Sequence, residues 1–136
     1  MQPDVGESLS DLAGKMPAAA KSIGPAGDGF LAVNPDAFAS DFASDAPKPV
    51  ARFMAISQVL VSAEAFDTKA TVAAWKQKPS YAVIPKQDRM INPDLERFMA
   101  KRAQSQVIEL PGSHAIFLSH AHEVAALIEK AATAAK

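Results

Sequence analysis

The sequence lacks cysteine, has no long hydrophobic run and has no cluster of positive charge. Without cysteine it forms no disulfide, offers no thiolate to a metal and has no cysteine nucleophile, a usage typical of a reducing compartment. Its 14 basic and 15 acidic residues argue against nucleic acid as a partner. No stretch approaches the roughly 20 apolar residues of a membrane-spanning helix. We therefore expect a cytoplasmic protein with no nucleic-acid or membrane partner.

The composition nevertheless supplies enough apolar material for a core. Of the 136 residues, 49% are hydrophobic and only 21% are charged. A chain of this length buries about two thirds of the surface that its unfolded form exposes. Global disorder is excluded, and a single domain is the first expectation.

The front of the chain, residues 1–33, is rich in glycine, proline, aspartate and serine, and we predict an irregular segment. One short helix is expected over residues 8–16, with Ser8 or Ser10 as its cap. The apolar run at residues 30–33 fits either a strand or a buried loop, because four residues do not define a period.

The middle of the chain has helical spacing. A cap and a first-turn proline at Asn34-Pro35 precede Phe38 and Phe42, which are four residues apart. A Pro-Lys-Pro break separates this helix from a second one. A third, short helix is expected near residues 62–66.

The back of the chain alternates between short apolar runs typical of strands and the three-to-four spacing of helices. Short apolar runs at residues 80–85 and 106–110 predict buried strands, and an amphipathic helix beginning at Asn92-Pro93 lies between them. A last helix is expected to start near residues 120–123. A strand, a crossover helix and a second strand imply parallel pairing in a right-handed unit.

Two polar residues follow the ends of these predicted strands. Asp88 comes three residues after Pro85, and His114 comes four residues after Leu110. The carboxyl ends of parallel strands share one edge of a sheet, so both loops are expected there. A carboxylate that accepts from Nδ1 of a histidine leaves Nε2 free to act as a base. An aspartate in a loop is also an ordinary turn residue, and Arg89 beside it reads as a solvated charge.

These residues belong to a longer pattern. The stretch from Pro85 to Pro93 and the tetrapeptide Gly112-Ser113-His114-Ala115 resemble the carboxyl-terminal half of α/β-hydrolase-fold proteins. The branch that they most resemble comprises small esterase-like bacterial hydrolases related to the methylesterase and hydroxynitrile lyase group. The middle of the chain resembles the helical lid of that branch, and the resemblance spans essentially the whole sequence.

The resemblance implies an α/β fold, a partial α/β-hydrolase fold with a helical lid followed by strand, helix, strand and helix of a parallel sheet. Residues 1–33 would be a connecting segment and the start of the lid region, residues 34–79 the lid, and residues 80–136 the last strands and helices of the hydrolase core. By the same resemblance Asp88 is the triad acid and His114 is the general base.

The resemblance also implies a small-molecule, ester-like substrate and no cofactor. Trp75, Phe38 and Phe42 are candidates for the substrate pocket, although aromatic side chains at helical spacing commonly pack in a core. No metal site is expected, because His120 and His122 are two residues apart and would not share one helix face.

The sequence departs from the family pattern in one respect. Enzymes of this fold carry a nucleophilic serine in a G-x-S-x-G turn, and that motif occurs nowhere in the chain. One hypothesis is a carboxylic ester hydrolase whose serine comes from an upstream hydrolase fragment. The alternative is a truncated or split fragment without catalysis, acting as a binding or assembly module that associates with such a fragment or with itself. Hydrolysis and a related lyase reaction both remain open.

Overall fold

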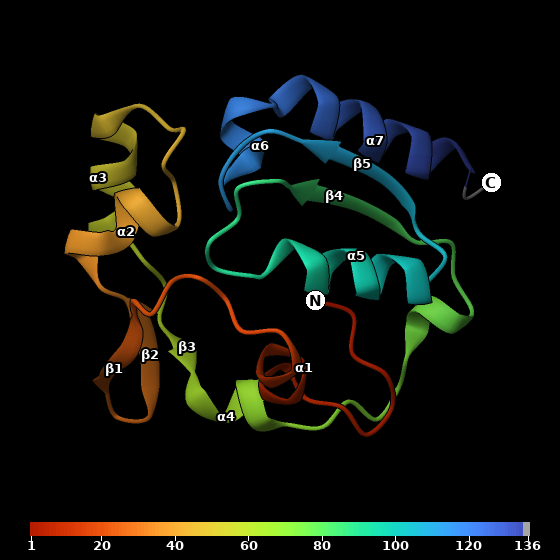
Figure 1. Cartoon of the computed structure of the whole chain (residues 1–136), viewed down its shortest axis with the longest axis horizontal. Helices are drawn as coiled ribbons and strands as arrows, with labels where there is room; N and C mark the ends of the chain where they lie inside the picture. Colours follow the sequence, from red (N-terminus) through yellow and green to blue (C-terminus); the bar gives the residue numbers. More distant parts are fainter. Residues whose placement is uncertain (135–136) are drawn as a thin grey trace.

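The computed structural model describes residues 1–134, and within them the strands form two small sheets (Figure 1). One sheet is antiparallel and three-stranded, and the other is parallel and two-stranded. Their strands are β1 (Ile23–Gly27), β2 (Phe30–Val33) and β3 (Val61–Ser62) in the first sheet, and β4 (Tyr81–Pro85) and β5 (Gln106–Leu110) in the second.

Helices surround both sheets. They are α1 (Leu9–Lys15), α2 (Pro35–Asp41), α3 (Lys48–Ile56), α4 (Ala63–Asp67), the 3₁₀ turn η1 (Ala74–Lys76), α5 (Pro93–Arg102), α6 (Ile116–Ser119) and α7 (Ala121–Ala134). Over residues 1–134, no helix has the length and apolar character needed to cross a membrane.

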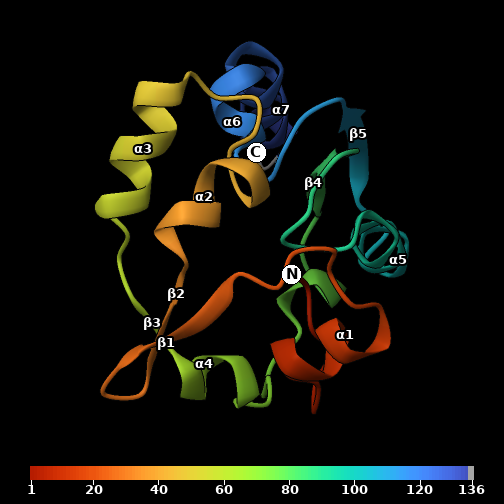
Figure 2. The ribbon, with the colours of Figure 1, turned by 60° about the vertical axis from the view of Figure 1, so that its left-hand side comes forward.

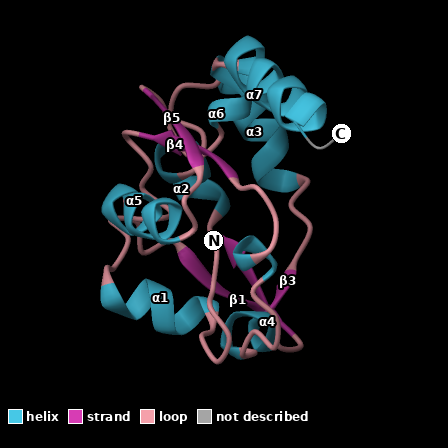
Figure 3. Cartoon of the chain, turned by 90° about the vertical axis from the view of Figure 1, so that its right-hand side faces the viewer, coloured by secondary structure: helices cyan, strands magenta, loops and turns pink. Residues whose placement is uncertain are grey.

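The parallel pair forms the unit that the sequence predicts. β4 and β5 pair in parallel, and α5 connects them after starting at Asn92, whose side chain accepts from the backbone N–H of Asp94 at 2.9 Å. α5 and α7 lie on opposite sides of the two strands (Figures 1 and 3). Ile84 of β4 is buried between them. The order of strand, helix, strand and helix is therefore confirmed.

The last helix is preceded by a turn of helix that the sequence pattern did not predict. α6 fills the interval between the His114 loop and α7. α7 begins at Ala121, as expected, but none of its described residues is fully buried. Val124 and Leu127 are half-buried and Ile128 is exposed, because only two strands lie beneath the helix.

The front of the chain contains a β-hairpin, so the expectation of an irregular segment over residues 1–33 is wrong there. β1 and β2 pair antiparallel and are closed by Asp28 and Gly29, which have φ angles of 49° and 78°. Positive φ at both turn residues gives the twist that a two-residue hairpin needs, and Asp-Gly is a favoured pair for it. Phe30 opens β2 and is thus in a strand.

The helices predicted for the middle of the chain are present as α2, α3 and α4. β3 between α3 and α4 is an addition, in which two residues pair with β2. Figure 2 shows α2 between the antiparallel sheet and the β4–β5 unit. A buried cluster joins these parts, made by residues of β2, α2, the turn after α2, α3 and the His114 loop: Val33, Phe38, Ala43, Ala51, Ala55 and Ala115.

A second buried cluster ties the front helix to the parallel unit. Leu12 of α1 packs with Leu95 and Met99 of α5, and the three side chains are at most 3% exposed. α5 thus has the sheet on one side and α1 on the other, which fixes the loop that precedes it.

Candidate active site

Asp88 and His114 meet at the carboxyl edge of the parallel sheet. Asp88 lies in the loop between β4 and α5, and His114 lies in the loop between β5 and α6. Nδ1 of His114 is 2.7 Å from Oδ2 of Asp88. The two loops are also bonded to each other, since the N–H of Gln87 donates to the carbonyl of Gly112 at 3.1 Å. Parallel pairing of the strands is what brings the two loops together.

The carboxylate of Asp88 is fully buried and bonded through both oxygens. Oδ1 accepts from the backbone N–H groups of Met90 at 2.7 Å and Ile91 at 3.0 Å, while Oδ2 faces the histidine. These bonds fix the plane of the carboxylate, so that one oxygen is aimed at His114 before any ligand is present.

The ring of His114 is partly exposed, at 29% for the side chain. An ionised carboxylate can only accept, so Nδ1 of the neutral ring carries the proton and Nε2 is a free acceptor. Across the part of the chain that is described, no hydrogen bond to Nε2 is present. The ring packs against Phe42 in a T-shaped arrangement, with centroids 4.7 Å apart, and Phe42 stacks on Phe38.

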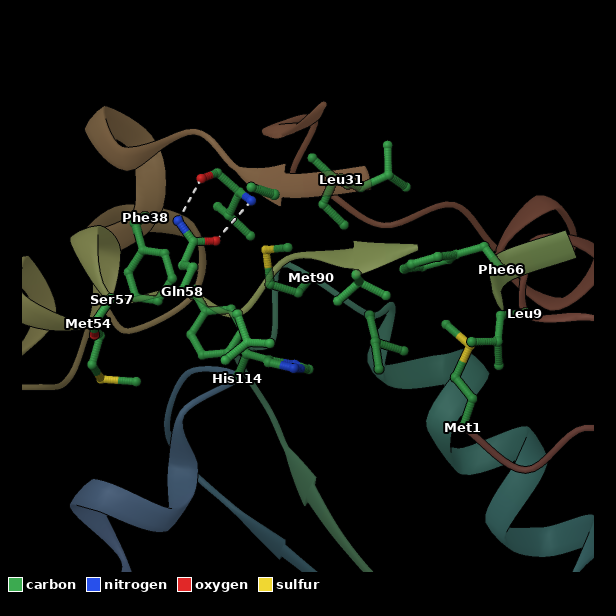
Figure 4. A pocket seen from close by; sticks show the side chains of 17 residues that line it. Met1, Leu9, Leu31, Phe38, Met54, Ser57, Gln58, Phe66, Met90 and His114 are labelled. Carbon is green, nitrogen blue, oxygen red and sulfur yellow. Dashed lines mark hydrogen bonds between the residues drawn. The ribbon is translucent and has the colours of Figure 1, made fainter. Parts of the chain in front are cut away.

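His114 forms part of the wall of an open cavity of about 580 Å³ (Figure 4). Phe38 and Phe42, both predicted as pocket residues, line it as well. The lining contains no lysine, arginine, aspartate or glutamate side chain. Most of the remaining wall comes from aliphatic residues, methionines and another phenylalanine: Leu9, Leu31, Val33, Met54, Val59, Val61, Phe66, Met90 and Ile91.

Gln58 is a polar residue among those that line this cavity. Its carboxamide accepts from the N–H of Val33 at 2.9 Å and donates to the carbonyl of Val33 at 2.8 Å. It therefore acts as a substitute strand partner for β2, and its polar atoms are bonded within the protein (Figure 4).

Trp75 lies elsewhere. Its indole N–H donates to the carbonyl of Pro3 at 2.9 Å, and its ring lies beside the cationic groups of Lys76 and Arg102. It does not line the cavity that contains His114. Its structural role is to hold the first residues of the chain against α5.

Several serines are engaged in local structure. Ser8 is the N-cap of α1 and accepts from the N–H of Asp11, and Ser10 donates to Asp67. Ser57 lines the cavity, but its hydroxyl donates to a backbone carbonyl one turn earlier in α3, at 2.8 Å. None of these hydroxyls is bonded to the histidine.

Two sets of side-chain hydrogen bonds between the middle of the chain and the site loops were not predicted from the sequence. Asp41 at the end of α2 bonds Nε of Arg89 at 2.9 Å, so Arg89 is paired although its side chain is half exposed. Asp45, in the turn between α2 and α3, bonds Ser113 and Ser119. The partners are 48 to 74 residues apart in sequence. No local spacing could have revealed them.

The pKa values of both carboxyl groups are lowered. The hydrogen bond from Arg89 is the main cause that lowers the pKa of Asp41. Burial opposes ionisation of Asp45, but the hydrogen bonds from Ser113 and Ser119 outweigh it and lower its pKa.

Glu96 of α5 is a buried carboxyl group that sequence reasoning did not single out. Burial, and secondly the negative charge of Asp88, raise its pKa to about 8. Its Oε2 is buried and has no hydrogen-bond partner in the region described. The Glu96 side chain is therefore mostly protonated at neutral pH.

Residues 1–134 contain no group of three or more histidine, aspartate or glutamate side chains arranged to hold a metal ion. The donor set at the site is one imidazole and one fully bonded carboxylate. Its chemistry is that of an oriented base.

A comparison with known protein families assigns the chain to a family. The model of the alpha/beta hydrolase family matches residues 2–127, nearly the whole chain. The chain therefore belongs to the alpha/beta hydrolase family, and the α/β fold class expected from the sequence is confirmed. No curated protein matches the chain.

Proposed function

We propose that this chain provides the acid and the base of a carboxylic ester hydrolase of the esterase-like branch. The observation that carries the proposal is the bond of 2.7 Å between His114 Nδ1 and the buried carboxylate of Asp88, at a histidine that forms part of the cavity wall. In this reading His114 is the general base, and Asp88 orients it and stabilises its protonated form.

The proposed substrate is a neutral ester with an apolar acyl or alcohol group. The cavity next to His114 is lined by phenylalanine, methionine and aliphatic side chains, and the described lining residues include no lysine or arginine side chain to pair with a substrate carboxylate. Burying an unpaired carboxylate there would cost several kcal/mol. We therefore expect neutral esters to be preferred over esters that carry a free acid.

The nucleophile in this proposal is a serine presented by another polypeptide segment. His114 would take the proton of that serine as it attacks the ester carbonyl, and would then deliver the proton to the leaving alcohol. Support comes from the missing G-x-S-x-G motif and from the hydroxyls of Ser8, Ser10 and Ser57, which are all committed elsewhere. We further propose that the enzyme is cytoplasmic, in keeping with a sequence that has no cysteine.

The test compares this chain alone with the chain produced together with the polypeptide encoded directly upstream of its Met1 codon. We expect hydrolysis of neutral p-nitrophenyl esters by the pair. His114→Ala should lower kcat/KM by about 1000-fold or more, because the base is lost. His122→Ala is the matched control, since His122 is exposed at the start of α7, and its rate should stay within about twofold.

Unchanged turnover in His114→Ala would contradict the assignment of the base. A fluorophosphonate probe of activated serines gives a second measurement, in which labelling is expected on the upstream polypeptide and not on this chain. Covalent labelling of this chain alone would contradict an external nucleophile. Absence of labelling and of turnover in both preparations would instead favour a binding or assembly role.

A further inference from the structure

The segment of residues 41–45, at the end of α2 and in the turn after it, touches both loops of the Asp88–His114 pair. Asp41 bonds Arg89, the residue after Asp88. The ring of Phe42 packs on the ring of His114. This segment belongs to the middle of the chain, yet it contacts the ring of His114 and bonds residues next to Asp88 and His114 in the chain.

His114 is bracketed by this segment on both sides along the backbone. The residue before it, Ser113, bonds Asp45 through its N–H at 3.1 Å and through its hydroxyl. The residue after it, Ala115, donates its N–H to the carbonyl of Phe42 at 2.9 Å. Ser113 and Ala115 are at most 1% exposed, so these donors have no access to water as an alternative partner.

Asp45 makes the side-chain hydrogen bonds between residues 41–45 and the His114 loop. One of its oxygens accepts the hydroxyl of Ser113, and the other accepts the N–H of Ser113 and the hydroxyl of Ser119 at 2.6 Å. The approach is close, because a Cβ at Gly112 would lie 2.6 Å from Oδ2 of Asp45. Gly112 has a φ of 152°, so both its conformation and its lack of a side chain suit this contact.

We propose that Asp45 is the positioning residue for His114 and acts through Ser113. The inference rests on the function proposed above. Asp45 touches neither the ring nor the cavity; it fixes the backbone from which the ring projects. Asp88 cannot follow a displaced histidine, because Oδ1 is held by Met90 and Ile91, so a shift of the His114 loop lengthens the bond from Nδ1.

The test is a spectroscopic measurement on the full chain, which needs no nucleophile and no substrate. Long-range proton–nitrogen correlation spectra of the histidine rings, recorded where the rings are neutral, report which nitrogen carries the proton. The signals of His114 are assigned with His114→Gln. In the unaltered chain we expect His114 to be protonated at Nδ1, with a proton that exchanges slowly with water.

In Asp45→Ala we expect a mixture of the two tautomers at His114 and exchange of the Nδ1 proton at least about tenfold faster. Asp45→Asn, which keeps the shape of the side chain but has one acceptor oxygen, should give a smaller change in the same direction. Asp28→Asn is the matched control, because it removes the same charge from the exposed hairpin turn and should leave the His114 signals unchanged.

Two serine variants separate positioning from general loosening of the turn. Ser113→Ala should shift the His114 signals, whereas Ser119→Ala, which loses another contact of Asp45, should leave them in place. If Asp45→Ala does not fold, the Asp45→Asn and Ser113→Ala spectra decide the question. Unaltered His114 signals in these folded variants would overturn the positioning role alone. A wild-type ring without the Nδ1 proton would overturn the proposed function itself.

Discussion

The loops of the parallel unit and the walls of the cavity are held by different kinds of interaction. In the loops, the carboxylate of Asp88 accepts three directed hydrogen bonds and is fully buried. The cavity wall instead carries exposed apolar side chains, including Val59 at 90% and Val61 at 46%. Directed bonds fix the angle at which a base meets a proton, whereas a wall needs only apolar bulk of suitable shape.

α2 takes part in both regions. Phe38 is 3% exposed within the apolar cluster, while Asp41 at the end of the same helix bonds Arg89. The helix thereby couples the shape of the wall to the placement of the loops. Three substitutions test whether the two regions are stabilised independently, beginning with the one of largest expected effect.

Leu95→Ala should produce the largest loss of stability. Leu95 is 1% exposed and joins α5 to α1, so its truncation leaves a cavity and should cost about 2 to 5 kcal/mol in the free energy of unfolding. Phe53→Ala in α3 is the comparison at an exposed position. Phe53 is 66% exposed, and its loss should stay within about 0.5 kcal/mol. Urea unfolding measures both, and equal losses would remove the distinction.

Glu96→Gln should change the dependence of stability on pH. The buried carboxyl has its pKa raised to about 8 from an ordinary 4.5, so the native state keeps a proton that the unfolded state releases between these values. Stability from this group is full below about pH 4.5 and falls as the pH rises to about 8. The glutamine variant should lack this decline.

The measurement is a series of thermal melts across that range. We expect Glu96→Gln to match the unaltered chain at the acidic end and to melt roughly 5 °C higher at the alkaline end. Asp94→Asn, two residues before Glu96 and exposed in the first turn of α5, is the control and should keep the decline. A variant that melts lower at alkaline pH would contradict the buried, protonated state.

Gly29→Ala should give a smaller loss than Leu95→Ala, confined to the hairpin. Its φ of 78° is costly for a residue with a Cβ, by about 1 to 2 kcal/mol, although nothing lies within 4 Å of the added atom. Gly14→Ala in α1 is the same substitution with the opposite expected sign, a gain of about 0.5 to 1 kcal/mol. Chemical denaturation gives both values, and a loss at both positions would contradict the backbone argument.

The sequence was most informative where local signals coincide with the fold. β4, β5 and the start of α5 follow from short apolar runs and an Asn-Pro cap, and the loop positions of Asp88 and His114 follow from these. The hairpin was missed although the signal was present. Pro25 and several glycines suggest a loop, but the Asp28-Gly29 pair is a strong hairpin signal and was the better guide.

Other features had no local signal. β3 has two residues, and α6 has four, which is too short for a periodic pattern. The bonds of Asp45 depend on how the turn after α2 meets a loop 68 residues later. Trp75 is a pocket candidate in the sequence as an aromatic residue. In the structure its indole N–H donates to the carbonyl of Pro3, a contact 72 residues away in sequence.

That place makes the single tryptophan of the chain an optical reporter. Its indole is bonded to Pro3 and lies 5.3 Å from Nζ of Lys76 and 5.4 Å from Cζ of Arg102, so its emission depends on whether the first residues are docked on α5. Detachment of this segment would shift the emission before the remaining structure melts. Trp75 is not among the described residues that line the cavity, so its emission reports on the docking of the first residues rather than on direct contact with a molecule in the cavity.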